Sequence, residues 1–204
     1  MLEGITWLGH ASFRIEGPEG VVYIDPWKLK DGPKADLVLV THDHYDHCVP
    51  EDIQKIAKAE TSIVTTASCA NKLTGDVHTV KAGDKITVKG VAIEVVPAYN
   101  IGKDFHPKAA GGVGYIITVG GRRIYHAGDT DLIPEMSTIR ADVALLPVGG
   151  KYTMTAEEAA EAANRIKPTV AVPMHWGDIV GSRADAERFK TLAKVPVQIL
   201  EQQK

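Results

Sequence analysis

Three of the eight histidines of this chain fall within six residues, inside the run T-H-D-H-Y-D-H that spans residues 41–47. His42 and His44 are two residues apart, so an extended backbone directs both side chains to the same side. Asp46 and His47 follow as the chain turns toward an expected helix at Pro50, and they can serve a neighbouring position. Imidazole and carboxylate groups are suitable zinc ligands. The run therefore predicts a metal site that can hold two divalent ions.

Two later residues share a feature with His42: each follows the carboxyl end of an expected apolar strand. They are Asp129 and His175. The strands that precede the three residues are expected at 36–41, 122–126 and 169–174. In a layered α/β domain such positions can share one edge of the sheets, where sites usually lie. Taken alone, Asp129 is typical of a turn and His175 of a core position, but their placement after apolar strands allows both to join the histidine run.

The elements that must position these residues alternate between short apolar strands and helices. Further strands are expected at 4–8, 11–16, 21–25, 62–66, 85–88, 91–98, 113–119, 143–148 and 196–200. Lys89-Gly90 and Gly120-Gly121 are typical of hairpin turns. Helices are expected from Pro50, at 68–74, from a capping box at Thr155 to about Lys167, and at 183–193. Strands in two halves, each half ending in helices, predict a four-layer α/β/β/α sandwich, one candidate among α/β folds.

The bulk properties are those of an ordinary globular protein. The 204 residues favour one domain, 1–204, and the formal net charge of −3 gives no footprint for nucleic acid. No apolar run approaches the ~20 residues that a membrane span needs, and no leader is evident, so we expect a cytoplasmic protein. Cys48 and Cys69 do not form a metal-type pair. Nothing in the sequence indicates the oligomeric state.

The run at 42–47 resembles H-x-H-x-D-H, the signature of the metallo-β-lactamase superfamily. Segments 7–12 (WLGHAS) and 24–27 (IDPW) resemble the branch with the ascorbate-phosphate lactonases and N-acyl-phosphatidylethanolamine phospholipase D. Segments 125–130 (YHAGDT) and 173–177 (PMHWG) resemble its later metal motifs. The resemblance implies the αββα fold and a dinuclear site. It assigns the first metal to His42 and His44, the second to Asp46, His47 and His175, and a bridging role to Asp129.

One position departs from this pattern. The lactonase-like relatives carry a third ligand of the first metal, a histidine, where this chain has Asn100. Amide oxygen is a weaker zinc ligand, and His106 in the following loop is the obvious replacement. Because Pro107 follows it, His106 is expected to have extended backbone. His10, in the first motif of the family, is expected beside the metals as a ligand or a substrate group, and Asp25 to brace the metal loop.

These residues suggest a hydrolase in which two divalent ions, zinc by expectation with manganese or iron as alternatives, activate a water. Asp46 would orient the nucleophile and accept its proton. A remaining positive charge favours a small anionic substrate with an ester, lactone or phosphoester bond. Two other readings stay open: an iron-dependent oxidoreductase of the dioxygenase type, which can keep the same loop, and a non-catalytic metal-binding protein.

Overall fold

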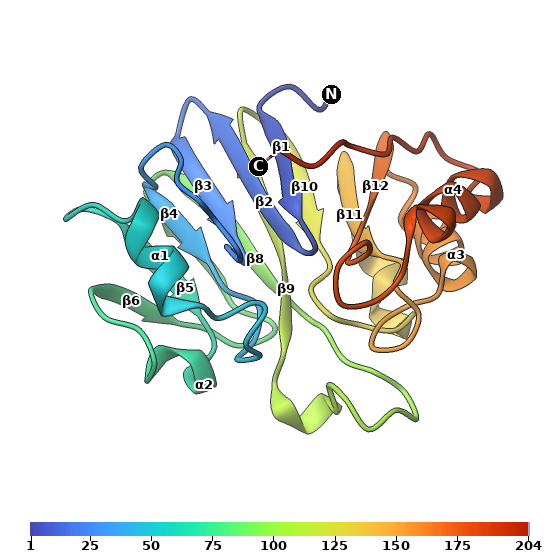
Figure 1. Ribbon diagram of the computed structural model, residues 1–204, viewed down its shortest axis with the longest axis horizontal. Helices are drawn as coiled ribbons and strands as arrows, with labels where there is room; N and C mark the ends of the chain where they lie inside the picture. Colours follow the sequence, from blue (N-terminus) through green and yellow to red (C-terminus); the bar gives the residue numbers. More distant parts are fainter. Residues whose placement is uncertain (204) are drawn as a thin grey trace.

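The computed structural model describes residues 1–203, so Lys204, the last residue of the expected domain, lies outside the described residues. Two six-stranded sheets pack face to face (Figure 1). The first sheet, in spatial order, contains β1 (Ile5–Gly9), β2 (Ser12–Gly17), β3 (Gly20–Ile24), β4 (Leu37–Leu39), β5 (Ser62–Thr65) and β6 (Asp76–Thr79). The second contains β12 (Val170–Met174), β11 (Val143–Pro147), β10 (Arg122–His126), β9 (Val113–Val119), β8 (Val91–Pro97) and β7 (Lys85–Val88).

The strand directions bring several loops to one end of the sandwich. In the first sheet β2 is antiparallel to both β1 and β3, and β4 is parallel to β3, so β1, β3 and β4 run the same way. In the second sheet β8, β10, β11 and β12 share one direction by the same logic. The loops that leave these strands gather at the lower end of the molecule in Figure 1. The histidine run, Asp129 and His175 all lie in such loops.

The sequence of strand β4 is apolar without interruption because both faces of the strand are buried. Leu37 and Leu39 belong to the main core between the sheets, whereas Val38 and Val40 pack on the other face with the helices. A strand buried on both faces has no solvent side on which to place polar residues. The apolar run ends at Thr41, where the chain leaves the sheet and the loop with the predicted metal ligands begins.

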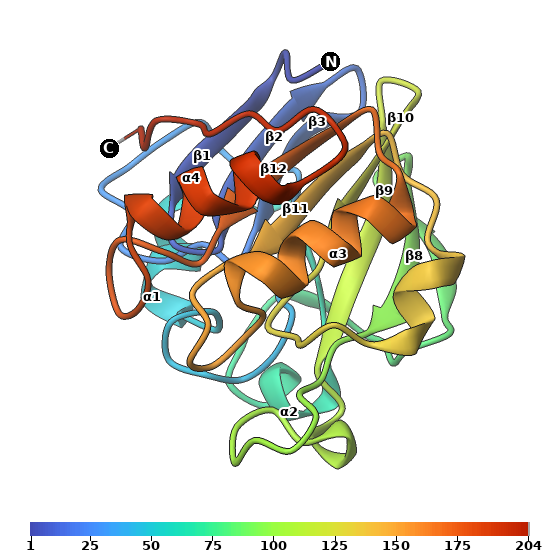
Figure 2. The same ribbon diagram turned by 90° about the vertical axis from the view of Figure 1, so that its right-hand side faces the viewer.

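Helices cover the outer faces of both sheets. The helix α1 (Pro50–Ile56) and the short α2 (Ala67–Ala70) pack on the first sheet. The helices α3 (Ala156–Ile166) and α4 (Arg183–Leu192) lie over the second (Figure 2). Two 3-10 helices, η1 (Lys108–Ala110) and η2 (Pro134–Thr138), interrupt the loops. The predicted four-layer α/β/β/α sandwich is confirmed. None of the described helices combines the length and the apolar character that crossing a membrane requires.

The helix cap and the hairpin turn predicted from neighbouring residues are both present. The Thr155 hydroxyl accepts a hydrogen bond from the backbone N–H of Glu158 at 3.2 Å, and the Glu158 carboxylate accepts one from the N–H of Thr155 at 2.8 Å. This is the predicted capping box. Lys89 and Gly90 both have positive φ, 51° and 78°, as a two-residue hairpin of the right twist requires.

The predicted last strand at 196–200 is wrong. Only one residue pair, Ala171 with Val197, bridges this segment to β12. The Ala171 N–H donates to the Pro196 carbonyl at 2.9 Å, and the Gln198 N–H donates to the Ala171 carbonyl at 3.0 Å. The next donor along β12 would be Pro173, which has no N–H. The ladder therefore stops after one step.

Candidate metal centre

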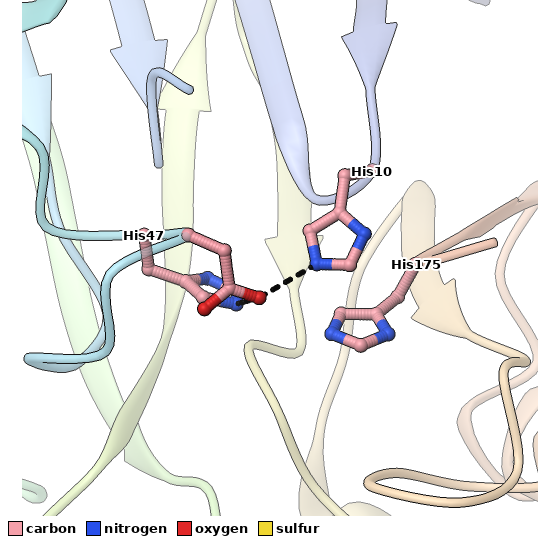
Figure 3. A group of neighbouring side chains, drawn as sticks. His10, His47 and His175 are labelled. Atoms are coloured by element: carbon pink, nitrogen blue, oxygen red, sulfur yellow. Dashed lines mark hydrogen bonds and ion pairs between the residues drawn. The ribbon is translucent and has the colours of Figure 1, made fainter. Parts of the chain in front are cut away.

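The structure brings the predicted site residues to one place from five segments of the chain. His42, His44, Asp46 and His47 lie in the loop after β4, and His10 follows β1. Asp129 follows β10, His175 follows β12, and His106 lies in the loop between β8 and β9. Figure 3 shows His10, His47 and His175 approaching one another from three of these segments. Residues up to 165 positions apart thus meet because their strands end at the same edge (10 to 175).

Three imidazoles form a first group. The His42 Nε2 atom lies 3.1 Å from the Nδ1 atom of His44, which in turn lies 3.0 Å from the Nε2 atom of His106. The three ligand atoms are all within 4.8 Å of one another. His106, and not Asn100, therefore supplies the nitrogen beside His42 and His44.

A second group contains His10, Asp46, His47 and His175, all buried. The Nε2 atom of His10 lies 2.9 Å from the Oδ2 atom of Asp46, and the Nε2 atom of His47 lies 3.5 Å from the same oxygen. The rings of His10 and His175 contact each other with centroids 3.9 Å apart and planes tilted by 41°. His10 thus lies among the expected ligands, as close to Asp46 as a hydrogen bond allows.

The Asp129 carboxylate lies between the two groups. Its Oδ2 atom is 3.3 Å from the Nε2 atom of His106 and 3.1 Å from the Nε2 atom of His175. Its Oδ1 atom is 3.4 Å from the Nε2 atom of His47. One carboxylate therefore contacts both groups of imidazoles.

Hydrogen bonds on the far side of the rings fix their orientation. The Nδ1 atom of His47 lies 2.7 Å from the Oδ2 atom of Asp25, and the Nδ1 atom of His42 lies 2.9 Å from the hydroxyl of Thr41. The Thr41 hydroxyl and N–H donate to Asp25 at 2.7 and 2.8 Å. The Nδ1 atom of His106 contacts the Tyr152 carbonyl at 3.1 Å. With Nδ1 donating, the neutral form of each of these rings presents the lone pair of Nε2 to the centre, the arrangement of metal-ligating histidines.

Several buried polar atoms between the two groups have no hydrogen-bond partner, and their chemistry indicates whether a cation fits there. Within residues 1–203, the Nε2 atoms of His47 and His175 and the Oδ1 atom of Asp129 are buried without a hydrogen-bond partner. Each such atom costs about 1–3 kcal/mol when left unsatisfied. All are lone-pair donors of the kinds that zinc binds. The residues present therefore fit divalent cations.

The charge state of the two carboxylates also favours cation binding at the centre. Burial raises the pKa of the Asp129 carboxyl, but the neighbouring His175 and His47 outweigh burial and hold its pKa well below the usual range. Burial also raises the pKa of Asp46, and hydrogen bonds with His10 and His47 outweigh it in the same way. Both groups are therefore ionised at neutral pH, and they supply two buried negative charges to attract cations.

Backbone strain is concentrated at these residues. Among residues 1–203, seven non-glycine residues have positive φ, and four of them belong to this region: His10 (51°), Asp25 (46°), His106 (56°) and His175 (59°). Such conformations cost of order 1–3 kcal/mol each and persist only where the surroundings impose them. The expectation of extended backbone at His106 was wrong: despite Pro107, the left-handed turn directs its ring toward His44.

Asn100 supports this loop from behind. Its Nδ2 atom donates to the Tyr152 carbonyl at 2.7 Å, the same carbonyl that His106 contacts, and its N–H donates to the carbonyl of His106 at 2.8 Å. Asn100 therefore occupies the expected ligand position in the sequence, but it holds in place His106, the third imidazole of the first group.

A cavity of about 260 Å³ opens over the centre. Besides His44, Asp46, His106, Asp129 and His175, it is lined by Tyr45, Phe105, Tyr152 and Ile179. None of these four residues was predicted from the sequence as part of the site. Tyr45 and Phe105 were detectable in principle, because each is a large apolar residue directly beside a histidine in an otherwise polar loop.

Comparison with known proteins identifies the superfamily of this chain. A model of the beta-lactamase superfamily domain matches residues 4–175, a span that contains every residue of both groups. The chain belongs to this superfamily. The UPF0173 metal-dependent hydrolase of Thermoplasma acidophilum is 39% identical in an alignment that covers 93% of this chain and 90% of the relative. That of Pyrococcus abyssi is 39% identical in an alignment that covers 92% of this chain and 91% of the relative.

Solved structures agree with this assignment. A crystal structure from Parabacteroides distasonis, assigned as a metal-dependent hydrolase, has a TM-score of 0.87 and 36% identity, and the match covers 98% of this chain and 93% of that one. Igni18, a metallo hydrolase from Ignicoccus hospitalis, has a TM-score of 0.80 and 27% identity, with 98% and 95% covered. The predicted superfamily is confirmed, and the chain is one of its metal-dependent hydrolases. The narrower lactonase and phospholipase branch stays a prediction.

Proposed function

We propose that this member of the superfamily is a dinuclear hydrolase that uses two divalent ions, zinc foremost. The observation that carries the proposal is the pair of imidazole groups on either side of the Asp129 carboxylate, at 3.1 Å from His175 and 3.3 Å from His106. Zinc bonds of about 2.0–2.1 Å at tetrahedral angles separate neighbouring ligand atoms by roughly 3.3 Å. The spacing of the side chains supports ligand sets around two ions with one shared carboxylate.

The first ion would be held by His42, His44 and His106, and the second by Asp46, His47 and His175, with Asp129 between them. His106 replaces the weaker Asn100 in this assignment, because its Nε2 atom is 3.0 Å from the Nδ1 atom of His44. His10 would act as an additional ligand of the second ion or hold Asp46 in place, given their contact at 2.9 Å.

Asp46 is the residue to which we assign the proton transfer. When bound, two divalent ions supply water activation near neutral pH and a net positive charge that favours an anionic group of the substrate. The Asp46 carboxylate lines the cavity and is ionised, so it can accept a proton there. His10 donates to its Oδ2 atom and fixes its orientation from the protein side.

The substrate that we propose is a small molecule, anionic at its reacting end, with an ester, lactone or phosphoester bond. The cavity of about 260 Å³ lies below the ~300–1,000 Å³ of sites for drug-sized ligands, which favours a small substrate over a polymer. A single hydrolase domain over 1–204 is consistent with the one core cluster that joins both sheets. The cytoplasmic location stays a prediction from the sequence.

The test measures bound metal and turnover in matched variants. Plasma emission analysis after zinc loading should give close to two ions per wild-type chain, with turnover in an ester, lactone and phosphodiester screen that chelator abolishes. Asp129→Asn should lower occupancy of both sites, because one carboxylate serves both. Asp46→Asn should lower chiefly one site and turnover.

The matched control is Asp52→Asn. Asp52 is a buried carboxylate on α1 that pairs with Lys55 at 2.6 Å, away from the metal centre. Two retained ions in Asp129→Asn would contradict the bridging role. Iron in place of zinc in protein purified without added metal, with no hydrolysis in the screen, would instead support the oxidoreductase.

A further inference from the structure

The large apolar side chains that remain exposed are not scattered over the surface. Six are exposed among the described residues: Met1, Tyr45, Ile101, Phe105, Ile179 and Leu192. Three of the six, Tyr45, Phe105 and Ile179, line the cavity of about 260 Å³ over the metal centre. Single exposed apolar residues need no explanation, but a group gathered around a cavity marks a binding surface.

The aromatic residues that line the cavity, Tyr45, Phe105 and Tyr152, each neighbour or contact a histidine of the metal centre. Tyr45 lies between His44 and Asp46 in the chain, and Phe105 directly precedes His106. Tyr152 supplies the carbonyl that His106 contacts at 3.1 Å. These three aromatic residues therefore lie beside the reacting end of the cavity.

The walls have the geometry of an aromatic pocket. The rings of Phe105 and Tyr152 meet edge to face, with centroids 4.7 Å apart and planes at 86°. Tyr45, 70% exposed, stands edge-on to Trp27 with centroids 6.4 Å apart. Aromatic rings prefer such offset and edge contacts, and a third ring can extend them.

Two of the lysines near this surface are engaged elsewhere. Lys103 forms an ion pair with Asp131, and Lys108 pairs with Glu135 at 3.1 Å. The ammonium of Lys151 lies 5.0 Å from the centroid of the Tyr152 ring. The outer part of the cavity therefore presents aromatic and aliphatic surface, in contrast to the charged centre beneath it.

We infer that the substrate carries one uncharged aromatic ring, which lies against Phe105, Tyr152 and Tyr45 while its scissile group reaches the metal centre. This inference rests on the proposed hydrolytic function and adds the class of substrate. The volume of about 260 Å³ leaves space for one ring and a short connection to the scissile bond.

The first experiment measures binding of the ring without metal or turnover. Saturation-transfer NMR on the full metal-free chain uses 3-phenylpropan-1-ol as the probe and propan-1-ol as its counterpart without a ring. The phenyl probe should bind, and Phe105→Ala should weaken it about three- to tenfold. Phe105→Leu, which keeps apolar volume without a ring, should fall between. Ile101→Ala is the matched control, because Ile101 is 57% exposed in the same loop but does not line the cavity.

The second experiment compares turnover of the zinc-loaded enzyme on ethyl propanoate, ethyl 3-phenylpropanoate and ethyl 3-(4-carboxyphenyl)propanoate. The two methylenes insulate the ester from the ring, so intrinsic reactivity is nearly matched. The phenyl ester should have at least tenfold higher kcat/KM than either counterpart.

The outcomes separate the inference from the proposed function. Ring binding that depends on Phe105, without hydrolysis of any ester, would support the pocket and count against ester hydrolysis. Hydrolysis without ring preference, with equal binding in Phe105→Ala and Ile101→Ala, would overturn the inference alone. Preference for the carboxyphenyl ester would also overturn it, because Lys151 would then select a charged ring.

Discussion

Replacing Asp25 by asparagine removes a buried charge that touches no expected metal ion, yet it should weaken metal binding. The Asp25 side chain is fully buried and accepts three hydrogen bonds, two from Thr41 and one from the Nδ1 atom of His47. An amide keeps one oxygen for the Thr41 N–H and turns its NH₂ group toward the other two partners. His47 must then leave Nδ1 unprotonated and carry its hydrogen on Nε2, the atom that faces the centre.

The size of the effect follows from these contacts. Loss of the group that hydrogen-bonds the far nitrogen of a ligating histidine lowers metal affinity about 10–100-fold. That corresponds to about 1.4–2.8 kcal/mol of binding free energy. The metal-free protein also loses hydrogen bonds to a charged group, so its free energy of unfolding should fall by about 1.5–3 kcal/mol.

Zinc affinity is measured by competition with a chromophoric chelator, and stability by urea unfolding of the metal-free protein. Asp36→Asn is the matched control, since Asp36 accepts a hydrogen bond from the Val21 N–H at 2.8 Å and lies before β4, at the strand end opposite the centre. The control should lose stability and keep zinc affinity. If Asp25→Asn binds zinc as tightly as the wild type does, Asp25 does not set the tautomer of His47 and the reasoning is refuted.

Three further changes test other parts of the structure. His106→Ala should reduce zinc from two ions toward one per chain, whereas Asn100→Ala should weaken binding less than tenfold; the reverse order, by plasma emission analysis, would make the asparagine the ligand. Gly128→Ala should lower the free energy of unfolding by about 1–3 kcal/mol, because at φ 66° its Cβ would lie 2.6 Å from the Val113 carbonyl; an unchanged urea midpoint would contradict this. Thr155→Ala should cost about 1 kcal/mol through loss of the helix cap without altering metal content, and a change in zinc stoichiometry would show that α3 affects the centre.

Local chemistry was readable from the sequence where neighbouring residues decide it. The capping box at Thr155, the hairpin at Lys89-Gly90 and the doubly buried β4 each follow from side chains within a few positions. The family resemblance, carried by the run at 42–47, supplied the layered fold. Asp129 and His175 were assigned through the same resemblance, and their places after apolar strands agreed with it, although neither residue is distinctive by itself.

Only the tertiary structure decided the features that depend on distant partners. Pro107 favours extended backbone at His106, yet the Tyr152 carbonyl, 46 positions further on, holds the residue in a left-handed turn. The last predicted strand failed because Pro173, on a different segment, offers it no N–H. The aromatic walls of the cavity likewise come from separate loops that no local pattern joins. In each case the free energy of packing and hydrogen bonding across the fold exceeds a local preference of one or a few kcal/mol, and the sequence near the residue does not contain that contribution.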